Sequence, residues 1–264
     1  MGTLLITLIQ TDIQWEKVKT NLAILEKKIL DIGQKTDVIV LPEMFTTGFS
    51  MNSNTLATTR ESYEFVWMAR MAKQANALIL GSLIVIENEK YYNQLIWMEP
   101  TGNFKTYNKR HLFRMENEHE HYASGNNRLI AHWRGWNICP LICYDLRFPL
   151  WSRNQWNREK QQLNYDLLIY VANWPERRII AWDTLLQARA VENLAFVAGV
   201  NRVGKDGNEV VYGGHSKVID PKGKILFDAQ KEEANKTIVL QFELMSSHRK
   251  KFPAYLDADN FRIT

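Results

Sequence analysis

The stretch LICYDLRFP at residues 141–149 decides the expected fold. An apolar run from Trp136 to Ile142 leads into it, and polar, helix-compatible residues from Asp145 to Asn157 follow it. This order predicts a buried strand, a sharp corner and a helix, as in an α/β protein. Cys143 stands at the corner, where free backbone amides and the helix dipole would favour a thiolate. The alternative is an inert buried cysteine, which is common in protein cores.

Two other stretches carry residues that suit a nucleophilic thiol. The predicted strand at residues 38–41 runs into Glu43, a carboxylate at the strand end where α/β sheets place their sites. Lys109 lies in the segment YNKRH, although a Lys-Arg pair is also typical of a solvated loop. Glu43, Lys109 and Cys143 together supply a base, a cation and a soft nucleophile, which is the minimum set for covalent acyl transfer.

With these motifs the chain resembles the nitrilase superfamily, also called carbon-nitrogen hydrolases, over nearly its whole length. The resemblance implies a Glu43-Lys109-Cys143 triad and a four-layer α-β-β-α sandwich, whereas the pattern alone predicts only α/β. The motifs that carry it are Leu41-Pro42-Glu43, Asn108-Lys109, residues 143–149, Asn173-Trp174-Pro175, residues 188–193, and Gly213-Gly214-His215-Ser216 with Asp220-Pro221.

The wording of two motifs, Asn-Trp-Pro and Tyr-Gly-Gly-His-Ser, is similar to the bacterial ω-amidase branch. That likeness implies hydrolysis of the terminal carboxamide of 2-oxoglutaramate and related short α-keto dicarboxylic monoamides, through a cysteine thioester. A nitrilase or an N-carbamoyl hydrolase would use the same triad. A non-catalytic family member acting as an interaction subunit is the alternative from another class, and a thiol redox sensor is a third.

The family usually has a second glutamate after its lysine motif. Glu118 is the first choice, because Tyr122 and Gly125 follow it at the family's spacing, while Glu116 and Glu120 compete. The histidines of His119-Glu120-His121 could share a metal on a strand, but the segment lacks further ligands. The triad needs no metal or cofactor, so we expect neither.

Four residues are expected to bind substrate. The Tyr144 backbone amide would join Lys109 in holding the oxyanion, and Trp174 would form an aromatic wall. Phe45 follows Glu43 closely and either lines the pocket or packs in the core. Arg177 would pair with a substrate carboxylate, unless it is a solvated loop residue.

Composition indicates the domain organisation, the partners and the cellular location of the protein. The 264 residues are expected to form a single domain, 1–264, whose polar tail at 246–264 would lie at a homodimer interface. The net charge of +4 is scattered, so a nucleic-acid partner is not expected. No apolar run approaches the ~20 residues of a membrane helix. The two cysteines, Cys139 and Cys143, are badly spaced for a disulfide, which favours a cytoplasmic location.

Overall fold

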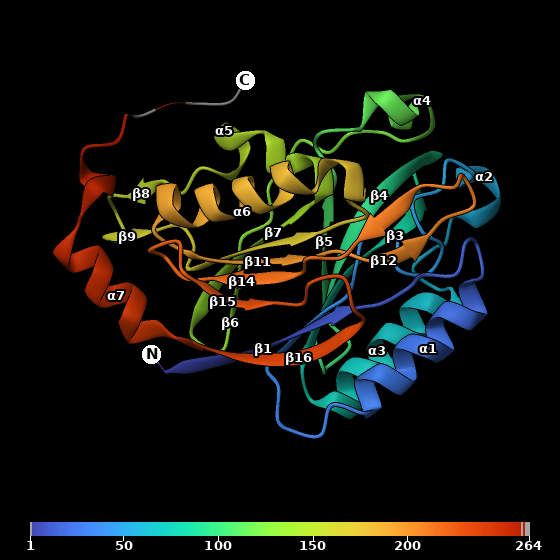
Figure 1. Cartoon of the computed structure of the whole chain (residues 1–264), viewed down its shortest axis with the longest axis horizontal. Coiled ribbons are helices and arrows are strands. Elements are labelled where there is room, and N and C mark those ends of the chain that lie inside the picture. The colour runs from blue at the N-terminus through green and yellow to red at the C-terminus, as the bar shows by residue number, and fades with distance from the viewer. Residues whose placement is uncertain (1, 260, 262–264) are drawn as a thin grey trace.

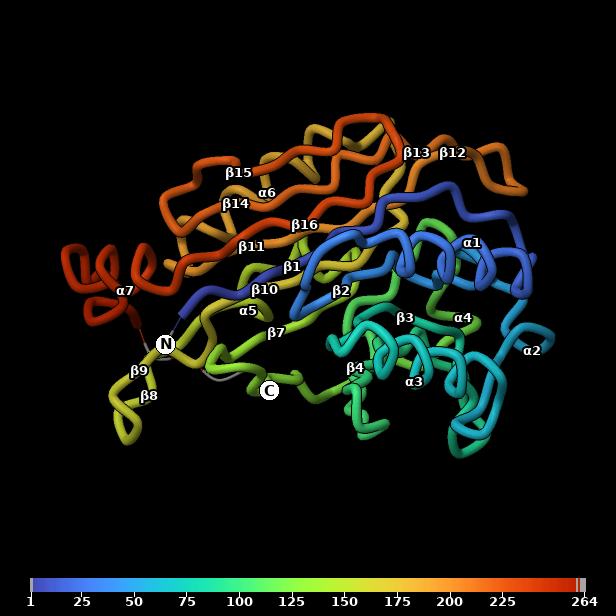
Figure 2. The backbone as a smooth tube through the Cα atoms, turned by 90° about the horizontal axis from the view of Figure 1, so that it is seen from below, coloured from blue at the N-terminus to red at the C-terminus, as the bar shows by residue number. Residues whose placement is uncertain are grey.

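Two six-stranded β-sheets stack face to face in the computed structural model, which describes residues 2–259 and 261 (Figures 1 and 2). The first has the order β16-β1-β2-β3-β4-β5 and the second β15-β14-β11-β10-β7-β6. Strands of the first sheet are β1 (Thr3–Gln10), β2 (Val38–Val40), β3 (Leu78–Glu87), β4 (Lys90–Met98), β5 (Phe104–Asn108) and β16 (Ala234–Gln241). Strands of the second are β6 (Ala131–Trp133), β7 (Trp136–Ile142), β10 (Leu167–Val171), β11 (Phe196–Val200), β14 (Lys217–Ile219) and β15 (Ile225–Asp228).

Helices cover the outer face of each sheet. Helices α1 (Val18–Leu30) and α3 (Tyr63–Ala75) pack on the first sheet, and α6 (Ile179–Asn193) packs on the second (Figure 1). Successive side chains of a strand point to opposite faces of its sheet, and β2 is apolar on both faces because both are covered. Val38 and Val40 pack in the cluster between the sheets, whereas Ile39 packs under α1 and α3. The layers are therefore α-β-β-α, and the expected fold class is confirmed.

Shorter elements connect and flank these layers. They are α2 (Ser53–Leu56), α4 (Glu118–His121), α5 (Pro149–Ser152), α7 (Phe242–Lys251), β8 (Trp156–Asn157), β9 (Gln162–Leu163), β12 (Val203–Lys205), β13 (Val211–Gly213) and the 3₁₀ turns at 114–116, 143–147, 176–178 and 254–256. Within residues 2–259 and 261, no helix has both the length and the apolar character to cross a bilayer.

Parallel pairing brings the ends of the central strands to common edges. Strands β1, β2 and β3 are parallel in the first sheet, and β7, β10 and β11 are parallel in the second. In the register of β7 and β10, Ile142 lies opposite Val171, so Cys143 and Asn173 leave neighbouring strands at nearly the same level. The carboxyl ends of such strands are where α/β sheets place their ligands.

Two local expectations were wrong. The helix predicted from Asp145 to Asn157 is instead a 3₁₀ turn at 143–147 followed by the short α5, because Phe148 is extended before Pro149. The polar tail expected at 246–264 is not a separate segment from its first residue, because it begins inside the helix α7, whose last turn carries His248 and three basic residues that suit its carboxyl end. Beyond α7 the chain packs back on itself, where Tyr255 stacks on Trp156 at 4.7 Å. Residues 260 and 262–264 of that tail lie outside the described residues.

Candidate active site

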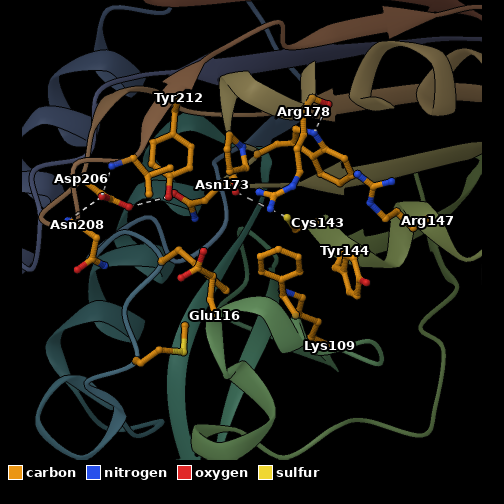
Figure 3. A pocket seen from close by; sticks show the side chains of 16 residues that line it. Lys109, Glu116, Cys143, Tyr144, Arg147, Asn173, Arg178, Asp206, Asn208 and Tyr212 are labelled. Atoms are coloured by element: carbon orange, nitrogen blue, oxygen red, sulfur yellow. Dashed lines mark hydrogen bonds between the residues drawn. The ribbon is translucent and has the colours of Figure 1, made fainter. Parts of the chain in front are cut away.

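Three segments from different parts of the chain meet at one pocket. Glu43 follows β2, Lys109 follows β5 and Cys143 follows β7. Lys109 and Cys143 line the pocket together with aromatic and polar side chains (Figure 3). Glu43 lies fully buried beneath it, within hydrogen-bond reach of Lys109.

The Glu43 carboxylate is held by three donors. Lys109 Nζ donates to Oε1 at 2.8 Å, Asn93 Nδ2 donates to the same oxygen at 2.7 Å, and the Asn173 backbone N–H donates to Oε2 at 2.8 Å. Asn93 is oriented in turn by Ser82, whose Oγ donates to its Oδ1 at 2.8 Å. A buried carboxylate with this many fixed partners is preorganised for proton transfer.

Lys109 is bound by two carboxylates. Its Nζ contacts Glu43 Oε1 at 2.8 Å and the two oxygens of Glu118 at 2.9 and 3.0 Å. Burial by itself lowers the pKa of the ammonium, but Glu118 and Glu43 together outweigh burial and raise that pKa above its usual value. Lys109 therefore stays charged at neutral pH.

Glu118 is the glutamate that reaches this cluster. It is fully buried, and burial, partly offset by Lys109, raises its pKa. Glu116 and Glu120 do not take its place: the Glu120 side chain is 62% exposed, and Glu116 faces Arg177 at 3.6 Å. The first choice among the three glutamates thus has the geometry expected of it.

Cys143 begins the turn after β7 with a φ of +42°. Non-glycine residues rarely adopt that conformation, and such strain is typical of functional corners. Its Sγ lies 3.9 Å from the backbone oxygen of Asn173. Burial, and then the adjacent Glu43 carboxylate, raise the pKa of the thiol well above its usual value. Burial thus opposes the thiolate that the corner was expected to favour, so the sulfur needs a base to become a nucleophile.

Asp145 ties this corner to the strand that carries Lys109. Its Oδ2 accepts from the Ile142 backbone N–H at 3.1 Å and from the Tyr107 hydroxyl at 2.6 Å, and its Oδ1 accepts from the His111 backbone N–H at 3.0 Å. The carboxylate is fully buried. These bonds fix the turn of Cys143 against the β5 end, so that nucleophile and cation keep one geometry.

Two of the four residues expected to bind substrate line the pocket, and the other two do not. Tyr144 and Trp174 line the pocket. Phe45 is fully buried and packs on Trp67 at 6.0 Å, so core packing was the correct alternative. Arg177 lies outside this pocket with its side chain 59% exposed, and its expected role there is not supported.

Sequence reasoning missed several polar residues of the site. Asn93 sits inside a strand whose last four residues, 95–98, are apolar, and an amide side chain in such a strand was a signal that could have been used. The Asn173 side chain was hidden within a family motif; its Oδ1 is buried without a partner, while its Nδ2 donates to the Glu43 backbone oxygen at 2.7 Å. Arg178 also lines the pocket, one position beyond the residue expected there.

No group of three histidine, cysteine or acidic residues suited to a metal ion occurs among residues 2–259 and 261. His119 and His121 lie on the short helix α4 rather than on a strand. Cys139 and Cys143 are both free thiols, and Cys139 is fully buried in β7.

Comparisons with known proteins agree with this geometry. The carbon-nitrogen hydrolase family model matches residues 5–249. The chain is 46% identical over 265 residues to Omega-amidase YafV of Escherichia coli K12, with all of both chains covered, and 32% identical over 255 residues to 2-oxoglutaramate amidase of Bacillus subtilis 168, with 96% of each covered. The crystal structure of XC1258 from Xanthomonas campestris, a CN-hydrolase superfamily protein with an arsenic adduct in the active site, matches with a TM-score of 0.98 at 41% identity over all of both chains. The chain therefore belongs to the carbon-nitrogen hydrolase family.

Proposed function

We propose that the protein is an amidase that hydrolyses the terminal carboxamide of short α-keto dicarboxylic monoamides, of the 2-oxoglutaramate type, to a carboxylate and ammonia. The observation that carries the proposal is the buried Glu43-Lys109-Glu118 cluster beside the Cys143 thiol at the floor of a pocket. Two relatives whose names state omega-amidase and 2-oxoglutaramate amidase activity support the substrate class.

The first half of the reaction forms a thioester. Glu43 takes the Cys143 proton as the sulfur attacks the amide carbon, because the raised pKa of the thiol leaves little thiolate at rest. The C–O double bond opens to an oxyanion. When the C–N bond breaks, the Glu43 proton passes to the departing nitrogen, which leaves as ammonia.

Lys109 and the Tyr144 backbone N–H stabilise the oxyanion. Two of the three Lys109 contacts go to the same Glu118 carboxylate, so one N–H can turn to the oxyanion while the ion pair persists. Loss of one such donor typically lowers the rate by about 100- to 1000-fold. In the second half, Glu43 takes a proton from water, the hydroxide adds to the thioester, and the acid and the Cys143 thiol are released.

The buried Oδ1 of Asn173 favours an amide over a nitrile. This oxygen lies in the pocket wall without a hydrogen-bond partner. A carboxamide offers N–H donors to it, whereas a nitrile carbon and nitrogen offer none. The nitrilase alternative would leave the oxygen unsatisfied, at a cost of about 1–3 kcal/mol.

The decisive experiment traps the covalent intermediate. Acid quenching during turnover of 2-oxoglutaramate, followed by mass spectrometry, should show an acyl group on the peptide that contains Cys143, and Cys143→Ala should abolish ammonia release. Panels of nitriles and N-carbamoyl compounds, assayed at the same concentrations, measure the competing activities. Absence of the adduct together with retained turnover by Cys143→Ala would refute the thioester, and an inactive wild type would support the non-catalytic alternative.

We also propose that the enzyme works as a homodimer in a reducing cytoplasm. The apolar side chains Leu150, Ile180 and Val191 are 50–80% exposed on α5 and α6, which lie on the same side of the second sheet (Figure 1). Exposed apolar surface of this kind marks interaction sites. Sedimentation equilibrium should give twice the chain mass of 30.9 kDa; a monomer at micromolar concentration contradicts the dimer.

A further inference from the structure

The Arg178 guanidinium enters the pocket from the loop after β10. Figure 3 shows its side chain running from the pocket rim towards Cys143. The Trp174 indole N–H donates to the Arg178 backbone oxygen at 2.9 Å, and the guanidinium carbon lies 5.2 Å from the centroid of the Phe113 ring. Backbone and side chain are therefore both held, so the cation is preorganised.

In the part of the chain that the structure describes, no carboxylate forms an ion pair with this cation. Its Nη1 is buried and finds no hydrogen-bond acceptor among the described residues, and its Nη2 donates to the Met115 sulfur at 3.4 Å. Its neighbour Arg177 differs, because it faces the Glu116 carboxylate at 3.6 Å and lies outside the pocket. A buried guanidinium N–H without an acceptor is costly, which points to a ligand that supplies one.

A second guanidinium lies nearby. Arg147 also lines the pocket, with its guanidinium carbon 5.0 Å from the centroid of the Trp174 ring. Among residues 2–259 and 261, no carboxylate lies within 4.0 Å of Arg147 or Arg178. Burial lowers the pKa of Arg178, and repulsion from Arg177 and Arg147 lowers it further. The Glu116 carboxylate, which also lines the pocket, partly offsets this effect, but it faces Arg177 at 3.6 Å. This end of the pocket therefore holds two guanidiniums, Arg147 and Arg178, against one carboxylate, while the Glu43 end carries two carboxylates and one ammonium.

We propose that Arg178, assisted by Arg147, binds the carboxylate at the end of the substrate remote from its carboxamide. The inference rests on the proposed amidase function and assigns its specificity: ω-monoamides of short dicarboxylic acids bind with the carboxylate on Arg178 and the amide carbon at Cys143. A planar guanidinium can donate two parallel N–H bonds to a carboxylate, which fixes orientation as well as affinity.

The test measures kcat/KM of Arg178→Met for an anionic and a neutral amide. Succinamate and 2-oxoglutaramate carry the carboxylate, and butyramide lacks it. A charge-assisted contact of this kind is worth about 10- to 150-fold, so the ratio of anionic to neutral kcat/KM should fall by that factor, mainly through KM. Arg178→Lys should restore part of the ratio. Arg177→Met, which removes the adjacent exposed arginine, is the matched control and should keep the wild-type ratio.

The outcomes of this test separate the possible explanations. Equal losses on both amides would give Arg178 a structural role and overturn the assignment, as would an unchanged ratio. A fall in the ratio for Arg177→Met but not for Arg178→Met would return the role to Arg177. If the wild type prefers butyramide to succinamate, the carboxylate site is refuted while the amidase function stands. If the wild type hydrolyses neither and forms no acyl-Cys143 adduct, the proposed function itself has failed.

Discussion

Replacing Glu118 by glutamine tests how Lys109 is held. The two carboxylate oxygens receive four contacts from donors: two from Lys109 Nζ at 2.9 and 3.0 Å, one from Asn93 Nδ2 at 3.3 Å and one from the Phe113 backbone N–H at 2.5 Å. A glutamine keeps one oxygen and presents an NH₂ group at the other position. Whichever way the amide turns, two of the four contacts then bring a donor against the NH₂ group.

The size of the effect follows from that count. One of the two lost contacts is to the ammonium and the other is to Asn93 or Phe113. At about 1.5 kcal/mol each, they remove about 3 kcal/mol of the interactions that position Glu118 and Lys109. If this loss is expressed fully in the transition state, kcat falls about 100-fold. Global stability should fall less, by about 1–3 kcal/mol, because the neutral side chain no longer suffers the burial that raises the pKa of Glu118.

The assay is steady-state ammonia release from 2-oxoglutaramate, together with urea denaturation monitored by tryptophan fluorescence. Glu120→Gln is the matched control, because that side chain is 62% exposed and lies on the same short helix α4. We expect the control to stay within about threefold of the wild type. Wild-type turnover by Glu118→Gln, or an equal loss in the control, would refute the reasoning that Glu118 positions Lys109.

Two further predictions concern the cysteines. Glu43→Gln removes the carboxylate charge that helps raise the pKa of Cys143, so iodoacetamide should alkylate this thiol faster at pH 8 while amide turnover falls at least about 100-fold; slower alkylation would contradict the pairing. Burial raises the pKa of Cys139 to about 12, against about 8.5 in an unfolded chain. Folding thus favours the protonated thiol. Its contribution to the free energy of unfolding is complete below pH 8.5 and is lost as the pH rises towards 12. Cys139→Ala should flatten the fall in unfolding free energy between pH 9 and 10.5 by about 1.4 kcal/mol per pH unit, as measured by urea denaturation; an unchanged slope would contradict it.

Much of the fold could be predicted because its signals are local. The apolar run Trp136–Ile142 forms β7 with the bounds expected from the sequence, and the strand predicted at residues 38–41 forms β2 (Val38–Val40). Such elements bury whole faces, so their periodicity is written into consecutive residues. The α7 helix was missed because its sequence, FELMSSHRKK, has few apolar residues and its only fully buried one is Met245.

The meeting of Glu43, Lys109 and Cys143 at one pocket could be predicted because each residue follows a strand and stands in a recognisable motif. Glu43 and Cys143 follow β2 and β7, which are parallel strands of the two stacked sheets, so both lie at carboxyl ends where α/β sheets place their ligands. Lys109 follows β5, an edge strand that runs antiparallel to β4, and was predicted from its motif. The protonation of Cys143 could not be predicted in the same way. Its raised pKa depends on burial and on the distance to Glu43, and both arise only when the two sheets stack.

The sequence by itself determined the order of elements, the apolar faces that form the layers and the three residue types that meet at the pocket, because periodicity and strand ends are properties of neighbouring residues. Only the tertiary structure decided which of adjacent residues faces the site: Glu118 rather than Glu116 or Glu120, and Arg178 rather than Arg177. Consecutive side chains on a helical turn point about 100–120° apart, so one position changes a pocket residue into a surface residue. That direction is set by packing against segments distant in the chain.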